Sequence, residues 1–270
     1  MGNYNEVGFL GAGSMGAMLV RAFVNAGALE ARQIWVSNRT PQKLQQLAAE
    51  VPGIHTADNA AIAARCRLLF LCMKHTDLGE ALKAMPLTPG HLLVTLSSPV
   101  PFEWFEQRAP SRVAKFIPAV TQEIGRGPSL LIWGPRITAD DASTLRELAS
   151  AISLPVIIPE QHRRLAADLA SAAPAFLAYL LFSMAEAAVR YDQSFAPEVG
   201  HTLVREMAIA TCALMAEKNM SYDEVIRRVA TPGGMTAKGL EVLAEHLPAV
   251  WKELFAALEQ REKDLAAKVG

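Results

Sequence analysis

Short runs of apolar residues alternate with amphipathic stretches through the first part of the chain. The runs predict strands, because a strand that a parallel sheet covers on both faces is continuously apolar. The stretches between them place apolar residues at helical spacing, as at Leu44, Leu47 and Ala48. The predicted strands are 6–10, 33–36, 67–73, 91–96, 112–118, 129–133 and 155–158, and the predicted helices are 15–26, 41–50, 57–65, 77–84, 102–108 and 139–151.

The pattern changes after residue 159, where no further strand is predicted. Apolar residues at helical spacing predict helices over 164–192, 197–219, 222–229, 237–243 and 248–269. Alternating strands and helices are typical of a doubly wound sheet. The predicted fold class is therefore α/β, with a doubly wound sheet over residues 1–159 and an all-helical domain over residues 160–270.

A glycine-rich turn joins the first predicted strand to the first predicted helix. Its glycines have the spacing G-x-G-x-x-G, which permits a tight turn, close approach of the backbone to a pyrophosphate, and close helix–strand packing. The pyrophosphate binds backbone N–H groups at the positive end of the helix. Strand, turn and helix in this order indicate a Rossmann-type dinucleotide site rather than an incidental glycine turn. The predicted cofactor residues of this turn are Gly11, Ala12, Gly13, Ser14, Met15 and Gly16.

The end of the second predicted strand favours NADP(H) over NAD(H). An NAD enzyme places Asp or Glu about 20 residues past the glycines, where it binds the ribose 2′-hydroxyl. No carboxylate follows this strand; Arg39 stands there and can pair with a 2′-phosphate. Thr40 and Pro41 also fit the N-cap and first position of the next helix, and both roles are compatible. The predicted cofactor residues after this and the following strands are Ser37, Asn38, Arg39, Thr40, Met73, Lys74 and Ser97.

Composition narrows the class of protein. Of 270 residues, 51% are apolar and 20% are charged, and the net charge of −1 favours neither nucleic acid nor an anionic membrane as partner. Three cysteines without a C-x-x-C pair predict reduced thiols in the cytoplasm, and the histidine spacing predicts no metal. Residues 169–185 carry no charge but are short for a membrane span. They predict a buried core or subunit-interface helix rather than a transmembrane one. A helical domain of this size has little room to bury such a helix, which predicts a homodimer or a higher homo-oligomer of dimers.

Segment 231–236, with the sequence T-P-G-G-M-T, interrupts the helical pattern of the second half. Its proline and glycines break one helix, and its last two residues begin another. Free backbone N–H groups and a hydroxyl at a helix N-terminus suit a substrate carboxylate. A plain helix–helix connection with Thr236 as N-cap accounts for the same residues.

This segment, the Asn-Arg-Thr at 38–40 and the order of elements resemble the pyrroline-5-carboxylate reductase family over nearly the whole chain. The resemblance implies a helical dimerisation domain and NADPH-dependent reduction of a cyclic imine substrate, most simply pyrroline-5-carboxylate to proline. It also implies that Thr236 hydrogen-bonds the ring nitrogen and that amides around Gly233 and Gly234 bind the carboxylate. The residues so implied are Thr236 as catalytic residue and Thr231, Gly233, Gly234, Met235 and Pro174 as substrate-binding residues.

Three segments depart from the family pattern, and the shortest is Lys74-His75 in place of the family's Lys-Pro. The family has Met-Pro-Asn-Thr-Pro where residues 117–121 are I-P-A-V-T, so Ala119 replaces an amide side chain. It has Ser-Gly-Ser-Gly-Pro-Ala-Tyr where residues 170–176 are A-S-A-A-P-A-F, of which Pro174 and Ala175 match. These changes make the predicted substrate pocket more apolar.

Three functions therefore stay open. The first is an imine reductase of this family, and the second is an NADP-linked oxidoreductase that acts on another imine or on a hydroxyacid. The third is a non-catalytic paralogue that binds NADP(H), of the kind that competence operons carry. Hydroxyacid chemistry usually needs a lysine base early in the helical domain. The chain has no lysine between Lys115 and Lys218, which disfavours a hydroxyacid substrate.

Overall fold

The computed structural model describes residues 4–266, which form two compact units. Unit 1 contains residues up to Pro174 together with the chain from Leu258 onward, and unit 2 is Ala175–Ala257. The sequence pattern instead suggests a division after residue 159, where the strands end. The first helical turns beyond that point stay with unit 1 because Ala170 packs with Ile117 and Leu130 of the sheet. Residue 159 as a domain boundary stays a prediction.

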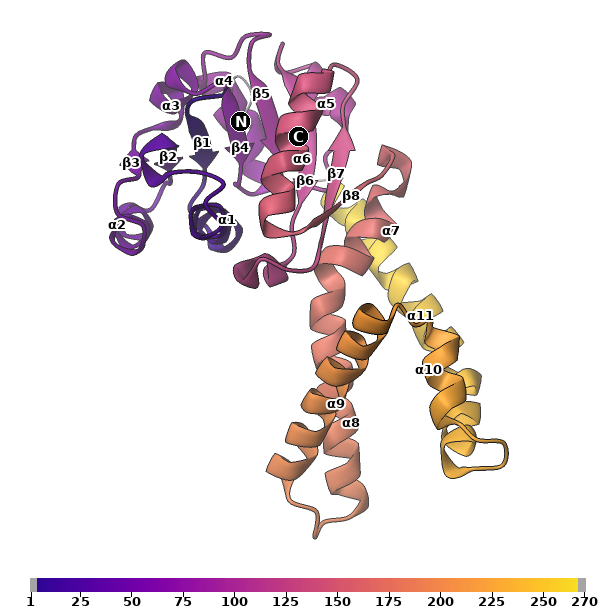
Figure 1. The fold of residues 1–270 in the computed structure, drawn as a ribbon. Coiled ribbons are helices and arrows are strands. Elements are labelled where there is room, and N and C mark those ends of the chain that lie inside the picture. The colour runs from indigo at the N-terminus through magenta and orange to yellow at the C-terminus, as the bar shows by residue number, and fades with distance from the viewer. Residues whose placement is uncertain (1–3, 267–270) are drawn as a thin grey trace. The chain divides into compact units, whose positions relative to one another are not determined.

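The eight strands of unit 1 form one sheet in the order β3-β2-β1-β4-β5-β6-β7-β8, with helices on both faces (Figure 1). The chain passes from β3, at one edge of the sheet, to β4 beside β1, so the strand order reverses between β1 and β4. In sheets of this kind ligands bind outside the carboxyl ends of the strands at such a switch point. The strands are β1 (Val7–Leu10), β2 (Ile34–Ser37), β3 (His55–Thr56), β4 (Leu68–Leu71), β5 (Leu92–Thr95), β6 (Arg112–Ile117), β7 (Pro128–Trp133) and β8 (Leu154–Ile157).

All seven predicted strands are present, and the doubly wound sheet is confirmed. The prediction missed β3, because its two residues are both exposed and form no apolar run. One pairing, between β6 and β7, is antiparallel. A parallel return needs a crossover of about a dozen residues or more, and the connection from Ile117 to Pro128 is too short for one.

The helices follow the predicted pattern except near the C-terminus. The prediction of separate helices over 237–243 and 248–269 is wrong, because α11 runs unbroken through Pro248. Proline removes one backbone hydrogen bond, and the strong helix formers around it keep the helix continuous. Residues 267–269 of that prediction lie outside the described residues. The helices are α1 (Ser14–Asn25), α2 (Pro41–Glu50), α3 (Asn59–Arg65), α4 (Leu78–Ala84), α5 (Phe102–Glu106), α6 (Ala139–Ile152), α7 (Arg163–Ala167), α8 (Ala173–Tyr191), α9 (Pro197–Lys218), α10 (Tyr222–Val229) and α11 (Met235–Ala266).

The sheet separates two layers of hydrophobic core. Side chains alternate along each strand, so Phe9 belongs to the layer under α1 and α6, while Leu10 belongs to the layer under α3, α4 and α5. The rings of Phe9 and Phe70 stack with centroids 4.8 Å apart at the centre of the first layer. Phe23 of α1 packs against both rings. This packing holds the last turn of α1 against β1 and β4.

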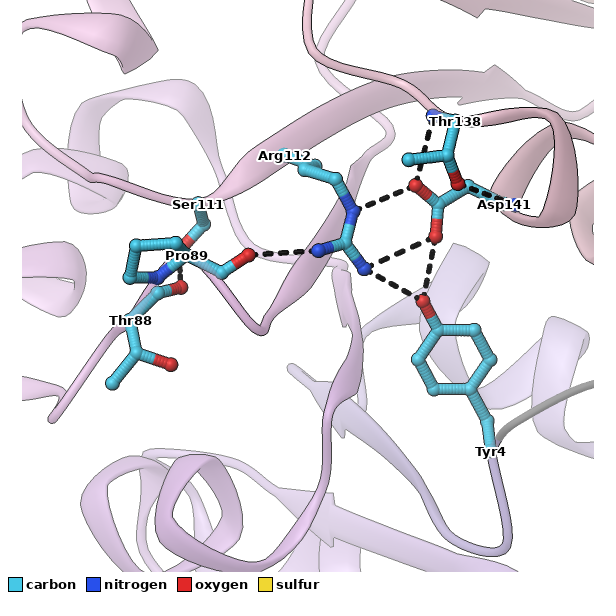
Figure 2. Close-up of polar contacts among 7 residues, drawn as sticks. All are labelled: Tyr4, Thr88, Pro89, Ser111, Arg112, Thr138 and Asp141. Carbon is cyan, nitrogen blue, oxygen red and sulfur yellow. Dashed lines mark hydrogen bonds and ion pairs between the residues drawn. The ribbon is translucent and has the colours of Figure 1, made fainter.

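A polar cluster ties the amino ends of β1 and β6 to α6 (Figure 2). The buried Asp141 carboxylate accepts hydrogen bonds from Arg112 Nε at 2.6 Å, from the Tyr4 hydroxyl at 2.7 Å and from the Thr138 N–H at 3.0 Å. Burial raises the pKa of Asp141, but these bonds outweigh burial and hold the pKa below its usual range. Burial and Asp141 together raise the pKa of Tyr4 to about 12. The cluster lies at the edge of the sheet opposite the glycine-rich turn.

Unit 2 consists of helices whose large apolar side chains are mostly exposed within this single chain. The helical run Glu160–Tyr191, which leads into unit 2, is long and apolar enough by length and composition to cross a membrane. Only 6% of its most apolar stretch is buried within the described chain. A π-helical turn, Asp168–Ala172, interrupts this run just before α8. Within unit 2, His201 Nε2 lies 3.2 Å from Glu186 Oε1 and joins α9 to α8.

Candidate functional site

A cavity of about 410 Å³ lies at the carboxyl ends of β1, β2 and β4, entirely within unit 1. This is the edge where the sheet's switch point predicts a ligand. Eight of the predicted cofactor residues line it: Gly11, Gly13, Ser37, Asn38, Arg39, Thr40, Met73 and Lys74. A shallower hollow of about 200 Å³ shares Gly13 with the first cavity, and it is lined by Ala12 and Ser14 as well.

The glycine-rich turn has the geometry that its spacing predicts. Gly11 has a φ of +116°, and a Cβ there would lie 2.9 Å from the backbone of Cys72. A Cβ on Gly16 would lie 2.0 Å from the carbonyl oxygen of Gly11. Both glycines are therefore required by the fold itself. The two positions bring α1 and the end of β4 close together.

Gly13 differs from the other two glycines. A Cβ there would meet nothing within 4 Å, so its missing side chain leaves open space beside the start of α1. Gly13 is also the N-cap of α1, and within the described structure no side chain caps the helix there. The free N–H groups of the first turn then face a space without side chains, which fits a pyrophosphate.

Asn38 connects the glycine-rich turn to the loop after β2. Its Oδ1 accepts a hydrogen bond from the Ala12 N–H at 3.1 Å, and its Nδ2 donates to the Thr40 carbonyl at 3.1 Å. The Ser37 hydroxyl donates to Asn59 Oδ1 at 2.5 Å. Thr40 is the N-cap of α2 with Pro41 in its first turn, as predicted. These contacts hold the loop against the cavity.

Arg39 lies at the cavity wall with its side chain 82% exposed. Its guanidinium pairs with Asp77, with Nη2 3.0 Å from Oδ2. Sequence reasoning missed Asp77 and Asn59 as lining residues. Asp77 lies at the start of the predicted helix 77–84, shortly after the predicted strand 67–73, and Asn59 lies near the start of the predicted helix 57–65. The carboxyl ends of parallel strands meet at one edge of a sheet, so residues that follow such strands are expected near a ligand there. That rule was the available signal for them.

Three other predicted cofactor residues lie outside the lining of the larger cavity. Met15 packs against the hydrophobic core, and Gly16 packs under Gly11. Ser97 follows β5, and its hydroxyl is one of two buried side-chain oxygens within residues 4–266 that have no hydrogen-bond partner; the other is Thr121. An unpaired buried hydroxyl at the carboxyl end of a strand fits a ligand group that has yet to bind. Ser97 stays a predicted contact.

The segment 231–236 forms a tight turn within unit 2. The Gly234 N–H donates to the Thr231 carbonyl at 2.9 Å, and Gly233 has a φ of +74°. Helix α11 begins at Met235, so Thr236 lies inside its first turn. The prediction of Thr236 as N-cap is therefore wrong, and the reading of the segment as a plain helix–helix connection stays open. Its side chain is exposed, as is that of Met235.

Pro174 lies in the first turn of α8, directly after the π-helical turn. The Ser171 hydroxyl within that turn donates to the Pro118 carbonyl at 2.7 Å. The segment that departs from the family pattern is thus fixed to the end of β6. Ala119, which replaces the family's amide, is fully buried.

Two parts of the chain match protein-family models. Residues 6–99 match the model described as NADP oxidoreductase coenzyme F420-dependent, and residues 160–265 match pyrroline-5-carboxylate reductase dimerisation. Among curated proteins, ComE operon protein 4 of Bacillus subtilis (strain 168) is 27% identical, over 97% of both chains. Pyrroline-5-carboxylate reductase 3 of the same strain is 28% identical, over 98% of both chains.

Solved structures share the fold over the whole chain. A pyrroline-5-carboxylate reductase from Coxiella burnetii superimposes with a TM-score of 0.86 at 21% identity, over 97% of this chain and 99% of that one. The Plasmodium falciparum pyrroline carboxylate reductase, solved with NADP bound, has a TM-score of 0.83 at 17% identity over both full chains. The two matched domains and the full-length relatives together support placing the chain in the pyrroline-5-carboxylate reductase family, whose solved structures share its fold.

Proposed function

We propose that the chain reduces a cyclic imine with NADPH, most simply pyrroline-5-carboxylate to proline. Its match to an NADP oxidoreductase domain and its full-length similarity to a reductase support an oxidoreductase that uses NADP(H). The substrate part of the proposal rests on the resemblance of segment 231–236 to the family, and the observation that supports the cofactor part is the cavity at the switch point of the sheet. There an open glycine turn faces a helix N-terminus, and Arg39 takes the place of the carboxylate typical of NAD enzymes.

The cofactor supplies a hydride for the imine carbon. The residues of unit 1 bind and orient it. N–H groups of the first turn of α1 hold the pyrophosphate beside Gly13, and Arg39 pairs with the 2′-phosphate. Lys43 lies at the wall of the same cavity and adds positive charge. Met73 and Lys74 border the cavity from the end of β4.

The segment 231–236 is the proposed substrate-binding element. The Gly234 N–H is engaged within the turn, so the carboxylate is held by the neighbouring free N–H groups at the start of α11. Gly234 is then required for shape, since a Cβ there would lie 2.6 Å from the Thr231 hydroxyl. The exposed Thr236 hydroxyl hydrogen-bonds the ring nitrogen. Pro174, which belongs to unit 1, stays a predicted substrate contact.

Reduction of a cyclic imine requires little of the protein beyond orientation of the substrate and the cofactor. A protonated cyclic imine is already electrophilic, so one hydrogen bond and correct positioning suffice. A hydroxyacid substrate needs a base. Lys115 is fully buried, with Nζ 2.7 Å from Glu160 Oε1 and 4.8 Å from the centre of the Phe102 ring. Burial lowers the pKa of Lys115, and Glu160 opposes that shift.

The activity is tested by the loss of NADPH absorbance on addition of pyrroline-5-carboxylate, next to a titration of cofactor binding. Rapid turnover supports the proposal and makes the changes at Ala119 and Phe176 tolerated variation. Turnover only with a different imine retains the reaction class and replaces the substrate. Failure to bind NADPH contradicts the proposal as a whole.

A non-catalytic role is the second candidate. Ala119 is buried where the family carries an amide side chain, and Phe176 lacks the family's phenol. A relative with nearly complete coverage is named only for its operon, as ComE operon protein 4. Tight NADPH binding without turnover on a panel of imines would favour this candidate.

Replacing Arg39 with glutamine is expected to weaken NADPH binding about tenfold, because a charge-assisted contact to the 2′-phosphate is lost at an exposed site. NADH lacks that phosphate, so its affinity should change by no more than about twofold. Fluorescence titration of both cofactors measures this. Equal weakening of both would place Arg39 elsewhere along the cofactor.

The apolar face of α8 is the proposed subunit interface. Leu177, Leu180 and Met184 are exposed at helical spacing within the single chain. The match of residues 160–265 to a dimerisation domain supports a homo-oligomer. A second subunit, rather than a membrane, then covers this face, in keeping with the proposed cytoplasmic location.

Leu180→Glu is expected to convert the oligomer to a monomer at micromolar concentration, because a charge in an apolar interface loses its hydration. Leu154→Glu, at an exposed leucine of β8 in unit 1, is the matched control and should leave the mass unchanged. Light scattering measures both. A wild-type monomer would contradict the proposed interface.

A further inference from the structure

A carboxylate reaches the cofactor cavity from an element other than β2. Asp77 ends the short 3-10 helix His75–Asp77 after β4 and lies at the cavity wall. It makes a two-point contact with Arg39, with Nη2 3.0 Å from Oδ2 and Nη1 3.5 Å from Oδ1. The cavity thus holds both the arginine typical of NADP enzymes and a carboxylate like that of NAD enzymes.

The direction of the Asp77 side chain is not explained by its own helix. Asp77 is the N-cap of α4, where aspartate usually accepts a hydrogen bond from the first turn. Within the described residues its side chain makes no such cap bond. The carboxylate turns to Arg39 instead. The direction of the Asp77 side chain is therefore set by its ion pair with Arg39 and not by helix capping.

We propose that Asp77 is a specificity-determining residue that lowers the preference of this site for NADP(H) over NAD(H). The inference rests on the proposed cofactor site. A 2′-phosphate must take Arg39 away from Asp77 and then lie beside a negative charge. A ribose 2′-hydroxyl instead finds in Asp77 a carboxylate acceptor. The pair sets how strongly the site distinguishes the two cofactors.

The exposure of the pair sets the size of the effect. The Arg39 side chain is 82% exposed and the Asp77 side chain 30%. Exposed ion pairs are weak, so phosphate displaces the carboxylate without difficulty. Asp77 therefore modulates NADPH binding and does not block it. A change of about fivefold is expected from removing one charge at this distance in a hydrated site.

The test is Asp77→Asn, with NADPH and NADH affinities measured by fluorescence titration of the full chain. NADPH should bind about fivefold more tightly than to the wild type, and NADH equally or more weakly. Glu80→Gln is the matched control, because Glu80 lies at the same cavity wall one helical turn further along. It removes the same charge away from the Arg39 contact and should leave the ratio of the two affinities nearly unchanged.

The Arg39→Gln variant provides a second background. It separates an effect of Asp77 that acts through Arg39 from a general effect on cofactor binding. In Arg39→Gln, adding Asp77→Asn should change the affinity ratio less than it does in the wild type, because competition for the guanidinium is gone. An unchanged ratio in Asp77→Asn, weaker NADPH binding, or an equal effect of Glu80→Gln would each overturn the inference while leaving the cofactor assignment intact. A wild-type chain that binds neither cofactor would overturn both.

Discussion

Thr236→Val is expected to lower the rate of hydride transfer to the imine about a hundredfold, the size of effect that follows loss of one oriented hydrogen bond in a reaction centre. Valine has nearly the shape of threonine and lacks only the hydroxyl. Thr236 is exposed in the first turn of α11, so the substitution should leave the fold intact. Single-turnover measurement of NADPH oxidation reports the hydride step directly.

The control for this prediction is Thr236→Ser, which keeps the hydroxyl and loses a methyl group. It should retain most of the rate. NADPH affinity should be the same in both variants, because the segment 231–236 is not part of the cofactor cavity. If the valine variant reduces the imine as fast as the wild type, Thr236 has no role at the ring nitrogen.

Asp141→Asn is expected to lower the free energy of unfolding by about 2–3 kcal/mol, the largest stability effect predicted here. Asp141 is 2% exposed and joins Arg112, Tyr4 and the start of α6. The amide loses the ion pair and leaves the Arg112 guanidinium poorly matched. Denaturant unfolding measures the loss. Asp140→Asn, at the exposed neighbour in the same first turn, should stay within about 0.5 kcal/mol of the wild type.

The pH dependence of this difference has a definite sign. The pKa of Asp141 is lowered in the folded chain, so its contribution is complete above the unfolded pKa of about 3.9 and is lost as pH falls through the folded pKa. The asparagine of the variant has no such titration. The gap between wild type and variant should therefore be constant near neutral pH and narrow below about pH 4. A gap independent of pH would assign the loss to packing alone.

The glycine-rich turn is a part of the fold and of the site that the local sequence pattern predicts. Gly11 and Gly16 leave no room for a side chain, and Gly13 leaves open space, so three positions a few residues apart determine both a fold and a site. Their spacing carries that information directly. The helix start after Thr40 follows in the same way from neighbouring residues, because caps act within one turn.

Asp77 is a residue of the cavity that the local sequence pattern did not predict. The loop after β2 has no carboxylate of its own, and the cavity receives one from the loop after β4 through the side chain of Asp77. Its pairing with Arg39 depends on how two distant segments meet, which spacing alone does not specify. The antiparallel β7 and the unbroken α11 were unpredicted for a related reason. For β7 the short connection from β6 decided the strand direction. For α11 the helix formers around Pro248 outweighed the helix-breaking signal of the proline.

The division of the chain into units has a consequence for its synthesis. Unit 1 contains the first 174 residues and the chain from Leu258 onward, and Arg163 pairs with Glu262 inside it. Every residue that lines the cofactor cavity precedes residue 85. A growing chain on the ribosome therefore makes every lining residue of the cavity long before it makes the helical turns from Leu258 that also belong to unit 1.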